Sequence, residues 1–422
     1  MISVVEPRRL SACAVATRSH LAHAKVLAAS FFAHHPDGRL YLLVIDGLPA
    51  GETLDPRVRL IAPEELATPW FWELCVRYEP LALSCALKPT VALTTIERYR
   101  ESAVVYLDGD LLLARPLEEA TRLLESADVV LTPHVLEPIE PDGCQPDELY
   151  ILTGGVYNMG FFGVRGSEEG RRFLRWWAER NRLGCRDAPT LGMYLDQRWI
   201  DLAPALFTNV AILRDATYNV AYWNLSSREI VLDGDRFLVN GEPLTFFHFS
   251  GIDLAAERFH PSYQSRFEIA PGTALHALVR RYAELLRAEG WTGHGGRYEL
   301  AFFDNGVPFH ALFKALYLKL PEARRAAFGN PFASGRSGSF FEWALTPDPA
   351  VAHLSPFLSA LYESDPEIPR RFPDVGGARR TAFVRWAMSD AARKLGYDPA
   401  LVRADPELAF ASQLPPVEAD GG

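Results

Sequence analysis

Several marks of common protein classes are missing from this sequence. No apolar run approaches the roughly 18 residues that a transmembrane helix needs. The five cysteines are scattered and include no C-x-x-C pair, which argues against a zinc knuckle and favours a reducing compartment such as the cytoplasm. The first residues carry Glu6, Arg8 and Arg9 and do not resemble a signal peptide. No G-x-G-x-x-G follows the first predicted strand, so a dinucleotide cofactor is not expected.

Positive charge is also scarce. The 422 residues include 43 lysines and arginines against 53 aspartates and glutamates, which gives a formal net charge of -10. This balance argues against general nucleic-acid binding. What is present is an ordinary globular composition, 48% hydrophobic and 23% charged, in a chain long enough for two or three domains.

The order of the predicted elements indicates an α/β domain. Strands are predicted at 10–16 and 40–45 with a helix at 21–34 between them, a unit that predicts parallel pairing of the two strands. A long helix at 81–98 precedes the next strand at 103–107, although Pro89 could mark the true start of that helix. The remaining predicted strands are 128–132, 152–164 and 244–249, and the remaining helices are 116–126, 167–181 and 190–199.

The pattern becomes mostly helical after residue 261. Helices are predicted at 274–289, 309–318, 349–362 and 379–395, and the tail from 413 is rich in proline, aspartate and glycine. We therefore predict an α/β domain over 1–265 and a helical C-terminal region over 266–422, whose role in substrate binding or oligomerisation the sequence leaves open.

One stretch carries the strongest chemical signal. The predicted strand 103–107 runs into Asp108-Gly109-Asp110, where Gly109 is expected to allow a tight backbone, and three leucines follow. Two carboxylates at the carboxyl end of a central strand lie where open α/β sheets bind ligands, and they repel unless a cation lies between them. Oxygen ligands suit Mg²⁺ or Mn²⁺. A solvated Asp-Gly turn is the alternative, which the flanking apolar runs disfavour.

His248 is the third candidate ligand. It ends a predicted strand and is followed by Ser250 and Gly251, which can turn the backbone toward a ligand. Two aspartates and one imidazole would leave positions open for phosphate oxygens, and the nitrogen shifts the preference toward Mn²⁺. The alternative is a histidine packed among the neighbouring phenylalanines.

The order of these motifs resembles the GT-A glycosyltransferases of the family 8 type, which include bacterial lipopolysaccharide galactosyltransferases and glycogenin. The resemblance covers about residues 10–262. It is carried by the segments Thr17-Arg18-Ser19-His20, Lys88, Asp108-Gly109-Asp110, Tyr157-Asn158-Met159-Gly160, Asp196-Gln197 and His248-Phe249-Ser250-Gly251. It implies a GT-A (Rossmann-like) fold with a mixed, mainly parallel sheet flanked by helices. Short segments after residue 300 are similar to bacterial glycosyltransferase tails and suggest a bacterial source.

The resemblance also implies an activity and a set of site residues. The activity is metal-dependent transfer of a sugar from a nucleotide-sugar, with UDP favoured, to an unknown acceptor, with retention of anomeric configuration. Mn²⁺ or Mg²⁺ would be bound by Asp108, Asp110 and His248, and Gln197 and Asp196 would act at the reacting sugar. The donor-binding residues would be Ala16, Thr17, Ser19, His20, Lys88, Leu107, Asp108, Gly109, Asn158, Gly251 and Arg258.

The acceptor is less defined. His134, Tyr222 and Trp223 are candidate acceptor contacts, with packing in the core as the alternative for each. The acceptor could be a glycan, a lipid-linked sugar, a natural product or a protein.

The sequence departs from the family pattern at two positions. A lysine and a proline-tryptophan pair usually follow the His-x-x-Gly segment and are missing here, so Arg258 is a candidate replacement for the lysine that contacts the diphosphate. His20 stands where the family often has a tyrosine, which leaves the nucleotide base open.

Three other functions fit parts of the pattern. Phosphatases of the haloacid dehalogenase type have Asp-x-Asp near the N-terminus rather than at 108–110. A nucleotide-sugar-binding protein without turnover would have no need of paired acids. An inverting GT-A transferase would use a carboxylate such as Asp196 or Glu148 as its base.

Overall fold

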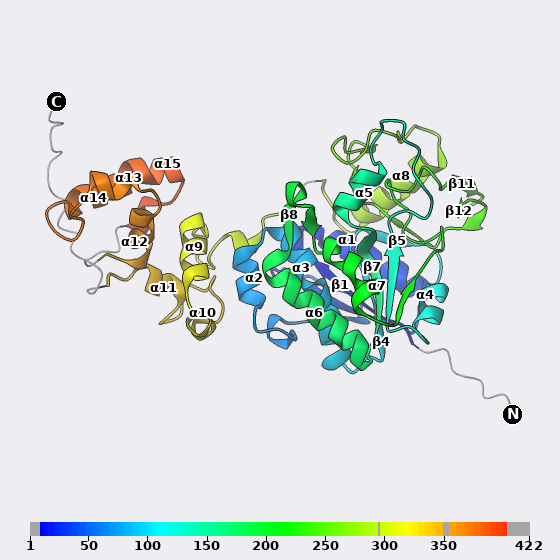
Figure 1. Ribbon diagram of the computed structural model, residues 1–422, viewed down its shortest axis with the longest axis horizontal. Coiled ribbons are helices and arrows are strands. Elements are labelled where there is room, and N and C mark those ends of the chain that lie inside the picture. The colour runs from blue at the N-terminus through cyan, green and yellow to red at the C-terminus, as the bar shows by residue number, and fades with distance from the viewer. Residues whose placement is uncertain (1–8, 294–295, 349–353, 403–422) are drawn as a thin grey trace. The chain divides into compact units, whose positions relative to one another are not determined.

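The computed structural model describes residues 9–293, 296–348 and 354–402. Contacts divide the chain into two compact units, one formed by 1–71 with 78–297 and the other by 72–77 with 298–422. The first unit contains a seven-stranded sheet flanked by helices (Figure 1). Together with the helical C-terminal region, this arrangement confirms the predicted fold class.

The sheet is mixed and mainly parallel, with the strand order β10-β6-β7-β4-β1-β2-β3. β1 pairs in parallel with both β2 and β4, whereas β7 runs antiparallel between β4 and β6. β1 and most of β4 are buried and apolar, as expected for strands covered on both faces. The strands are β1 (Ser11–Ala16), β2 (Arg39–Val44), β3 (Val58–Leu60), β4 (Ala103–Leu107), β6 (Val129–Pro133), β7 (Tyr157–Arg165) and β10 (Val210–Ile212).

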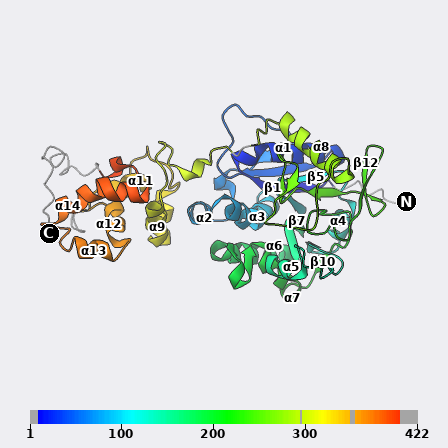
Figure 2. The same ribbon diagram turned by 90° about the horizontal axis from the view of Figure 1, so that it is seen from above.

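Helices cover the sheet on both sides. Figure 2 shows α1 (Leu21–His34) and α8 (Ala274–Ala288) on one face, with α3 (Pro80–Glu97) and α6 (Glu168–Gly184) on the other. α1 joins β1 to the parallel strand β2, as predicted. α3 does not begin at Pro89 but runs through it, because its second half is almost entirely buried and this packing outweighs the roughly 3 kcal/mol cost of an interior proline.

A separate two-stranded sheet assembles the predicted metal ligands. β5 (Leu111–Leu113) follows Asp110 directly, and β14 (Phe246–His248) pairs with it antiparallel, so that His248 lies opposite Leu111. The backbone N–H of Phe249 donates to the carbonyl of Asp110 at 3.0 Å. This register brings a residue from far along the chain to the end of β4.

Two other local predictions are wrong. Residues 152–154, predicted to open a strand, close helix α5 (Glu148–Gly154), and the chain leaves that helix at Gly155 with a φ of 108°. Residues 190–199, predicted as one helix, form short 3-10 turns around β9 (Met193–Leu195). Gly192 adopts a left-handed conformation with φ 65°, which breaks the expected helix and lets β9 pair with β8 (Arg186–Ala188).

The remaining short elements complete the first unit. β11 and β12 form a hairpin around Asp233 and Gly234. The remaining bounds are α4 (Glu118–Leu123), α7 (Ala203–Leu206), β11 (Ile230–Asp233), β12 (Arg236–Val239), β13 (Glu242–Pro243), β15 (Ile252–Asp253) and β16 (Arg258–Phe259).

Helix α8 belongs to the first unit, whereas the predicted boundary at 265 would put it in the C-terminal region. Its buried residues Leu278, Val279 and Tyr282 pack in one core cluster with Tyr222 and Phe249. The contact-based division therefore falls after residue 297, later than the predicted boundary at 265.

The second unit is helical and has an aromatic core built on Phe303, Phe309, Phe313 and Phe340. It includes most of α2 (Phe71–Arg77). Its other helices are α9 (Ala311–Lys319), α10 (Glu322–Phe328), α11 (Phe340–Leu345), α12 (Pro356–Glu363), α13 (Glu367–Arg371), α14 (Arg380–Trp386) and α15 (Ala392–Leu395). The predicted tail from 413 and the start of the helix predicted at 349–362 lie outside the described residues. Among those described, no helix combines the length and apolar character needed to cross a membrane.

Candidate metal centre and cavity

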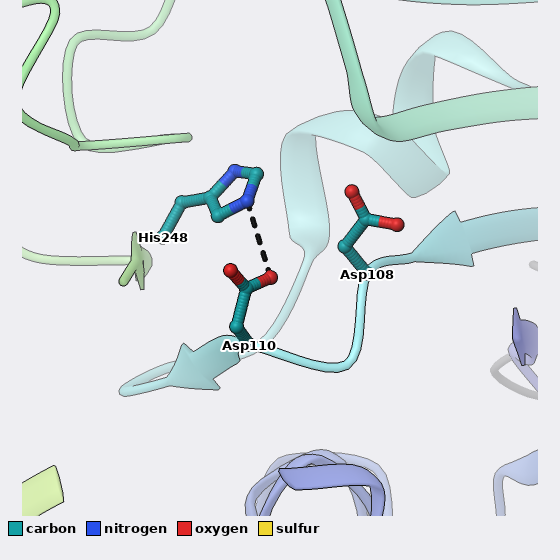
Figure 3. A group of neighbouring side chains, drawn as sticks. All are labelled: Asp108, Asp110 and His248. Carbon is teal, nitrogen blue, oxygen red and sulfur yellow. Dashed lines mark ion pairs between the residues drawn. The ribbon is translucent and has the colours of Figure 1, made fainter. Parts of the chain in front are cut away.

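The three predicted metal ligands lie together at the end of β4 (Figure 3). One ligand atom from each of Asp108, Asp110 and His248 lies within 4.8 Å of the other two. Nε2 of His248 is 3.2 Å from Oδ1 of Asp110. The aspartates are half-buried and the histidine is buried.

Asp108 is held by neighbouring hydrogen bonds. Its backbone N–H donates to the carbonyl of Gly160 at 2.8 Å, and its two carboxylate oxygens accept from the Tyr106 hydroxyl at 2.9 Å and from Lys88 Nζ at 3.0 Å. Each oxygen keeps a second lone pair that a metal could use. The position of this carboxylate is therefore set by the protein before any metal binds.

Lys88 is a buried cation beside the centre. Its Nζ also donates to the carbonyl of Met159 at 3.1 Å and lies 4.0 Å from Oδ2 of Asp196. Burial lowers the pKa of Lys88, but the charges of Asp108 and Asp196 outweigh it and hold that pKa above its usual value. Lys88 thus carries a positive charge at neutral pH.

The donor chemistry of the three ligands fits a divalent cation. Burial alone would raise the pKa of Asp110, but His248 and, less strongly, His23 hold it well below its usual range, so the carboxylate is ionised. Two carboxylates and an imidazole suit Mn²⁺, and Mg²⁺ is the oxygen-preferring alternative. The site would leave coordination positions for ligand oxygens.

Asp196 is an acid of the site whose ionised form is disfavoured by burial. It is buried, and its Oδ2 accepts no hydrogen bond from the part of the protein that the structure describes. Burial raises the pKa of Asp196 to about 6; Lys88 opposes this shift and Asp108 adds to it.

Asp196→Asn should change the pH dependence of stability. The native carboxyl of Asp196 keeps its proton up to about pH 6, whereas the carboxyl in the unfolded chain ionises near pH 4. The contribution of the protonated Asp196 side chain to the free energy of unfolding is therefore complete below pH 4 and is lost as the pH rises to about 6. Two units correspond to about 3 kcal/mol. Urea unfolding at pH 4.5, 5.5 and 7 should show wild-type stability falling relative to the variant, and parallel curves would contradict the environment described for Asp196.

A cavity of about 1000 Å³ extends from the metal centre. Most of the predicted site residues line it, as expected from their order along the chain. These residues are Ala16, Thr17, His20, Lys88, Asp108, Gly109, Asp110, His134, Asn158, Asp196, Gln197, Tyr222, Trp223, His248 and Gly251.

Three predicted donor-binding residues do not line the cavity. Arg258 lies on β16 with 69% of its side chain exposed, 3.9 Å from the carboxylate of Asp253. The structure therefore does not bring Arg258 into the lining of the cavity. Ser19 contacts the site indirectly through hydrogen bonds with Thr17 and His20, and Leu107 is buried in the core. Glu148, the other carboxylate considered as a base, also lies outside the cavity lining.

Other polar residues of the cavity lining are held by hydrogen bonds. Asn158 accepts from the N–H of Gly160 at 3.0 Å and donates to Nε2 of His134 at 3.2 Å, while Nε2 of Gln197 donates to the carbonyl of Gly154 at 2.6 Å. Burial lowers the pKa of His134 to about 4, so this histidine is neutral at pH 7. Its contact orients Asn158 toward the cavity.

The predicted acceptor aromatics are buried. Tyr222 shares a hydrogen bond of 2.9 Å with Tyr150, and the ring of Trp223 lies edge-on to those of His248 and His134 at 5.1 and 5.3 Å. Sequence reasoning did not single out Tyr150 or Asn219, and Asn219 contacts His248 directly. The only sequence feature that points to Asn219 is its amide side chain, which lies in a segment rich in aromatic residues.

Gly160 leaves room for the histidine ligand. A methyl group there would come within 2.4 Å of His248 Cε1 and 2.8 Å of Asn158 Oδ1. We expect Gly160→Ala to displace the imidazole and weaken Mn²⁺ binding by at least about tenfold, measured by isothermal titration calorimetry.

Gly109→Ala is the matched control for Gly160→Ala. Gly109 lies in a tight turn, as predicted, in which the N–H of Leu111 donates to the carbonyl of Asp108 at 3.2 Å. Its φ lies outside the left-handed region, and an added methyl group would lie 3.9 Å from His23 Cβ. This variant should bind Mn²⁺ as the wild type does. Equal affinity in both glycine variants would show that Gly160 does not protect the ligand geometry.

The chain is similar to known proteins over part of its length. No protein-family profile matches the chain. It is 33% identical over 192 residues to the uncharacterized protein YfnF of Bacillus subtilis (strain 168), and this match covers 44% of this chain and 58% of that relative. It is 22% identical over 318 residues to the uncharacterized protein YfnD of the same organism, and this match covers 72% of this chain and 97% of that relative. The solved structure of the galactosyltransferase LgtC with donor and acceptor sugar analogs has 15% identity and a TM-score of 0.38, with 66% of this chain and 96% of that chain covered.

Proposed function

We propose that this protein is a metal-dependent glycosyltransferase of the GT-A type that uses a nucleotide-sugar donor. The observation that carries the proposal is the set of Asp108, Asp110 and His248 on the wall of a cavity large enough for such a donor. The order of the sequence motifs supports the same class. The sparse, scattered cysteines support a cytoplasmic location.

The residues around the centre have roles that suit this chemistry. The bond to be broken joins the anomeric carbon to a phosphate oxygen, so negative charge develops on the diphosphate. A divalent cation held by Asp108, Asp110 and His248 would stabilise that charge. Lys88 adds a buried positive charge at the same end of the cavity.

Further residues that line the cavity would bind the sugar. Asn158 and Asp196 would bind donor hydroxyls, and Gln197 would lie beside the anomeric carbon. His20 and Thr17 would contact the nucleoside, with a UDP-sugar as the favoured donor. We propose retention of configuration, as the family resemblance implies. An inverting reaction with Asp196 as base is the competing mechanism, and the anomeric configuration of the product distinguishes the two.

The acceptor would enter where Tyr222 lines the cavity. Because Trp223 and His134 are packed against the metal ligand or against Asn158, Tyr222 is the stronger of the three candidates for contact with it. The acceptor class is left open among glycans, lipid-linked sugars, natural products and proteins.

Nucleotide release without acceptor tests the proposal. Purified protein would be incubated with Mn²⁺ and a panel of UDP-, GDP- and dTDP-sugars, with and without chelator. We expect slow hydrolysis of one donor that the chelator stops. No release from any donor, together with Mn²⁺-dependent nucleotide binding, would instead favour a binding protein of degenerate GT-A fold.

A further inference from the structure

We propose that Asn219 is a positioning residue that fixes the proton of His248 on Nδ1, so that Nε2 is free to bind the metal. The inference deepens the proposed function and rests on it, because it concerns how the same centre is built. Neither the sequence motifs nor the family resemblance assigns a role to Asn219.

The contact between Asn219 and His248 is within hydrogen-bonding distance and buried. Oδ1 of Asn219 lies 3.1 Å from Nδ1 of His248, and both side chains are buried, with Asn219 fully so. An amide oxygen can only accept, so the nitrogen that faces it must carry the proton. The other nitrogen, Nε2, then points toward Asp110 and can donate its lone pair to a cation.

Asn219 is held so that its oxygen stays in this place. Its φ is 52°, a left-handed conformation that asparagine and aspartate adopt more readily than other side chains. The Asn219 carbonyl accepts from Nδ2 of Asn224 at 2.9 Å, and Oδ1 of Asn224 accepts from the N–H of Ala221 at 3.0 Å. The turn is thus closed by buried side-chain hydrogen bonds on both sides.

The same turn holds His248 at two further points. The backbone N–H of His248 donates to the carbonyl of Val220 at 2.8 Å, and the ring of Trp223 packs edge-on against the imidazole. The segment 218–224, in which the sequence suggests acceptor contacts, is therefore built around a metal ligand. Asn219 supplies the acceptor at Nδ1, whereas Nε2 faces the carboxylate of Asp110 at the metal centre.

Only the oxygen of the Asn219 amide is used. Its Nδ2 is buried and has no hydrogen-bond partner in the described part of the chain. Aspartate has the same shape, tolerates the left-handed conformation and can only accept, so Asn219→Asp keeps the contact with His248 and loses no other hydrogen bond. Glycine also tolerates the backbone but removes the acceptor. These two variants separate the proposed role from a general effect on folding.

The experiment compares Mn²⁺ and Mg²⁺ affinities by isothermal titration calorimetry. Asn219→Gly should weaken Mn²⁺ binding by at least about tenfold and reduce the preference for Mn²⁺ over Mg²⁺, since the nitrogen ligand is the one that becomes disordered. Asn219→Asp should bind Mn²⁺ within about threefold of wild type or more tightly. Asn240→Gly is the matched control, because Asn240 is also left-handed, with φ 53°, but is exposed in the β12–β13 turn.

The outcomes separate this inference from the proposed function. Wild-type Mn²⁺ affinity in Asn219→Gly, or an equal loss in Asn219→Asp and Asn219→Gly, would overturn the role of Asn219 and leave the transferase proposal standing. Mn²⁺ binding that follows the expected variant order without nucleotide release would remove the transferase and support the role of Asn219. A wild-type protein that binds no divalent cation would overturn both.

Discussion

Asp110→Asn is expected to reduce Mn²⁺-dependent nucleotide release by at least about a hundredfold, which corresponds to about 2.7 kcal/mol of lost transition-state stabilisation. The substitution keeps the shape of the side chain but removes the charge that faces His248 and the metal. The fold should persist, because the contact between β5 and β14 uses the backbone carbonyl of Asp110, which the variant retains. Release rates and thermal melting of the same preparations check both parts.

The control for this variant is an aspartate outside the cavity. Asp233 is the exposed last residue of β11, so Asp233→Asn should release nucleotide at the wild-type rate. If Asp110→Asn kept more than half of the wild-type rate in the presence of Mn²⁺, the metal centre would not be the source of activity.

Lys88→Met is expected to have the largest effect on stability. Lys88 is the buried cation between Asp108 and Asp196, and methionine replaces its apolar stem without the charge. Removing one partner of a buried ion pair typically costs about 3–5 kcal/mol, because the charge that is left behind stays buried without a partner. The loss should be smaller in saturating Mn²⁺ than in chelator, because a metal at Asp108 supplies part of the missing positive charge.

A double variant isolates the reason for that loss. Asp196→Asn removes one of the charges that Lys88 neutralises, so Lys88→Met with Asp196→Asn should be more stable than the sum of the two single effects predicts. Urea unfolding of the four proteins measures this coupling. A melting temperature for Lys88→Met within about 2 °C of wild type would contradict the ion-pair description.

The central strands could be predicted because their signal is local. The run 103–107 is apolar and β-branched, and the structure places β4 over the same residues. The chemistry of Asp108 and Asp110 also followed from their position after that strand. His248 could be proposed only by its type and its place in the motif order, because the antiparallel register with Leu111 joins residues that are far apart in the chain.

Where the structure differs from these expectations, the cause lies in how the backbone turns and packs. The helix expected at 190–199 has suitable residues, but the left-handed Gly192 turns the chain into a hairpin. Arg258 has the right charge, but the β15–β16 hairpin leaves it exposed beside Asp253. For α8, amphipathic spacing predicts a buried face without indicating that this face packs on Phe249, where the ring of Tyr282 stacks at 3.7 Å.

The most direct test of the account is the binding of UDP to the wild-type protein with and without Mn²⁺, measured by isothermal titration calorimetry. If Asp108, Asp110 and His248 hold a cation that contacts the diphosphate, Mn²⁺ should tighten UDP binding by at least about tenfold while leaving uridine binding unchanged. UDP affinity that is the same in chelator and in Mn²⁺ would contradict the metal centre as the site of donor binding.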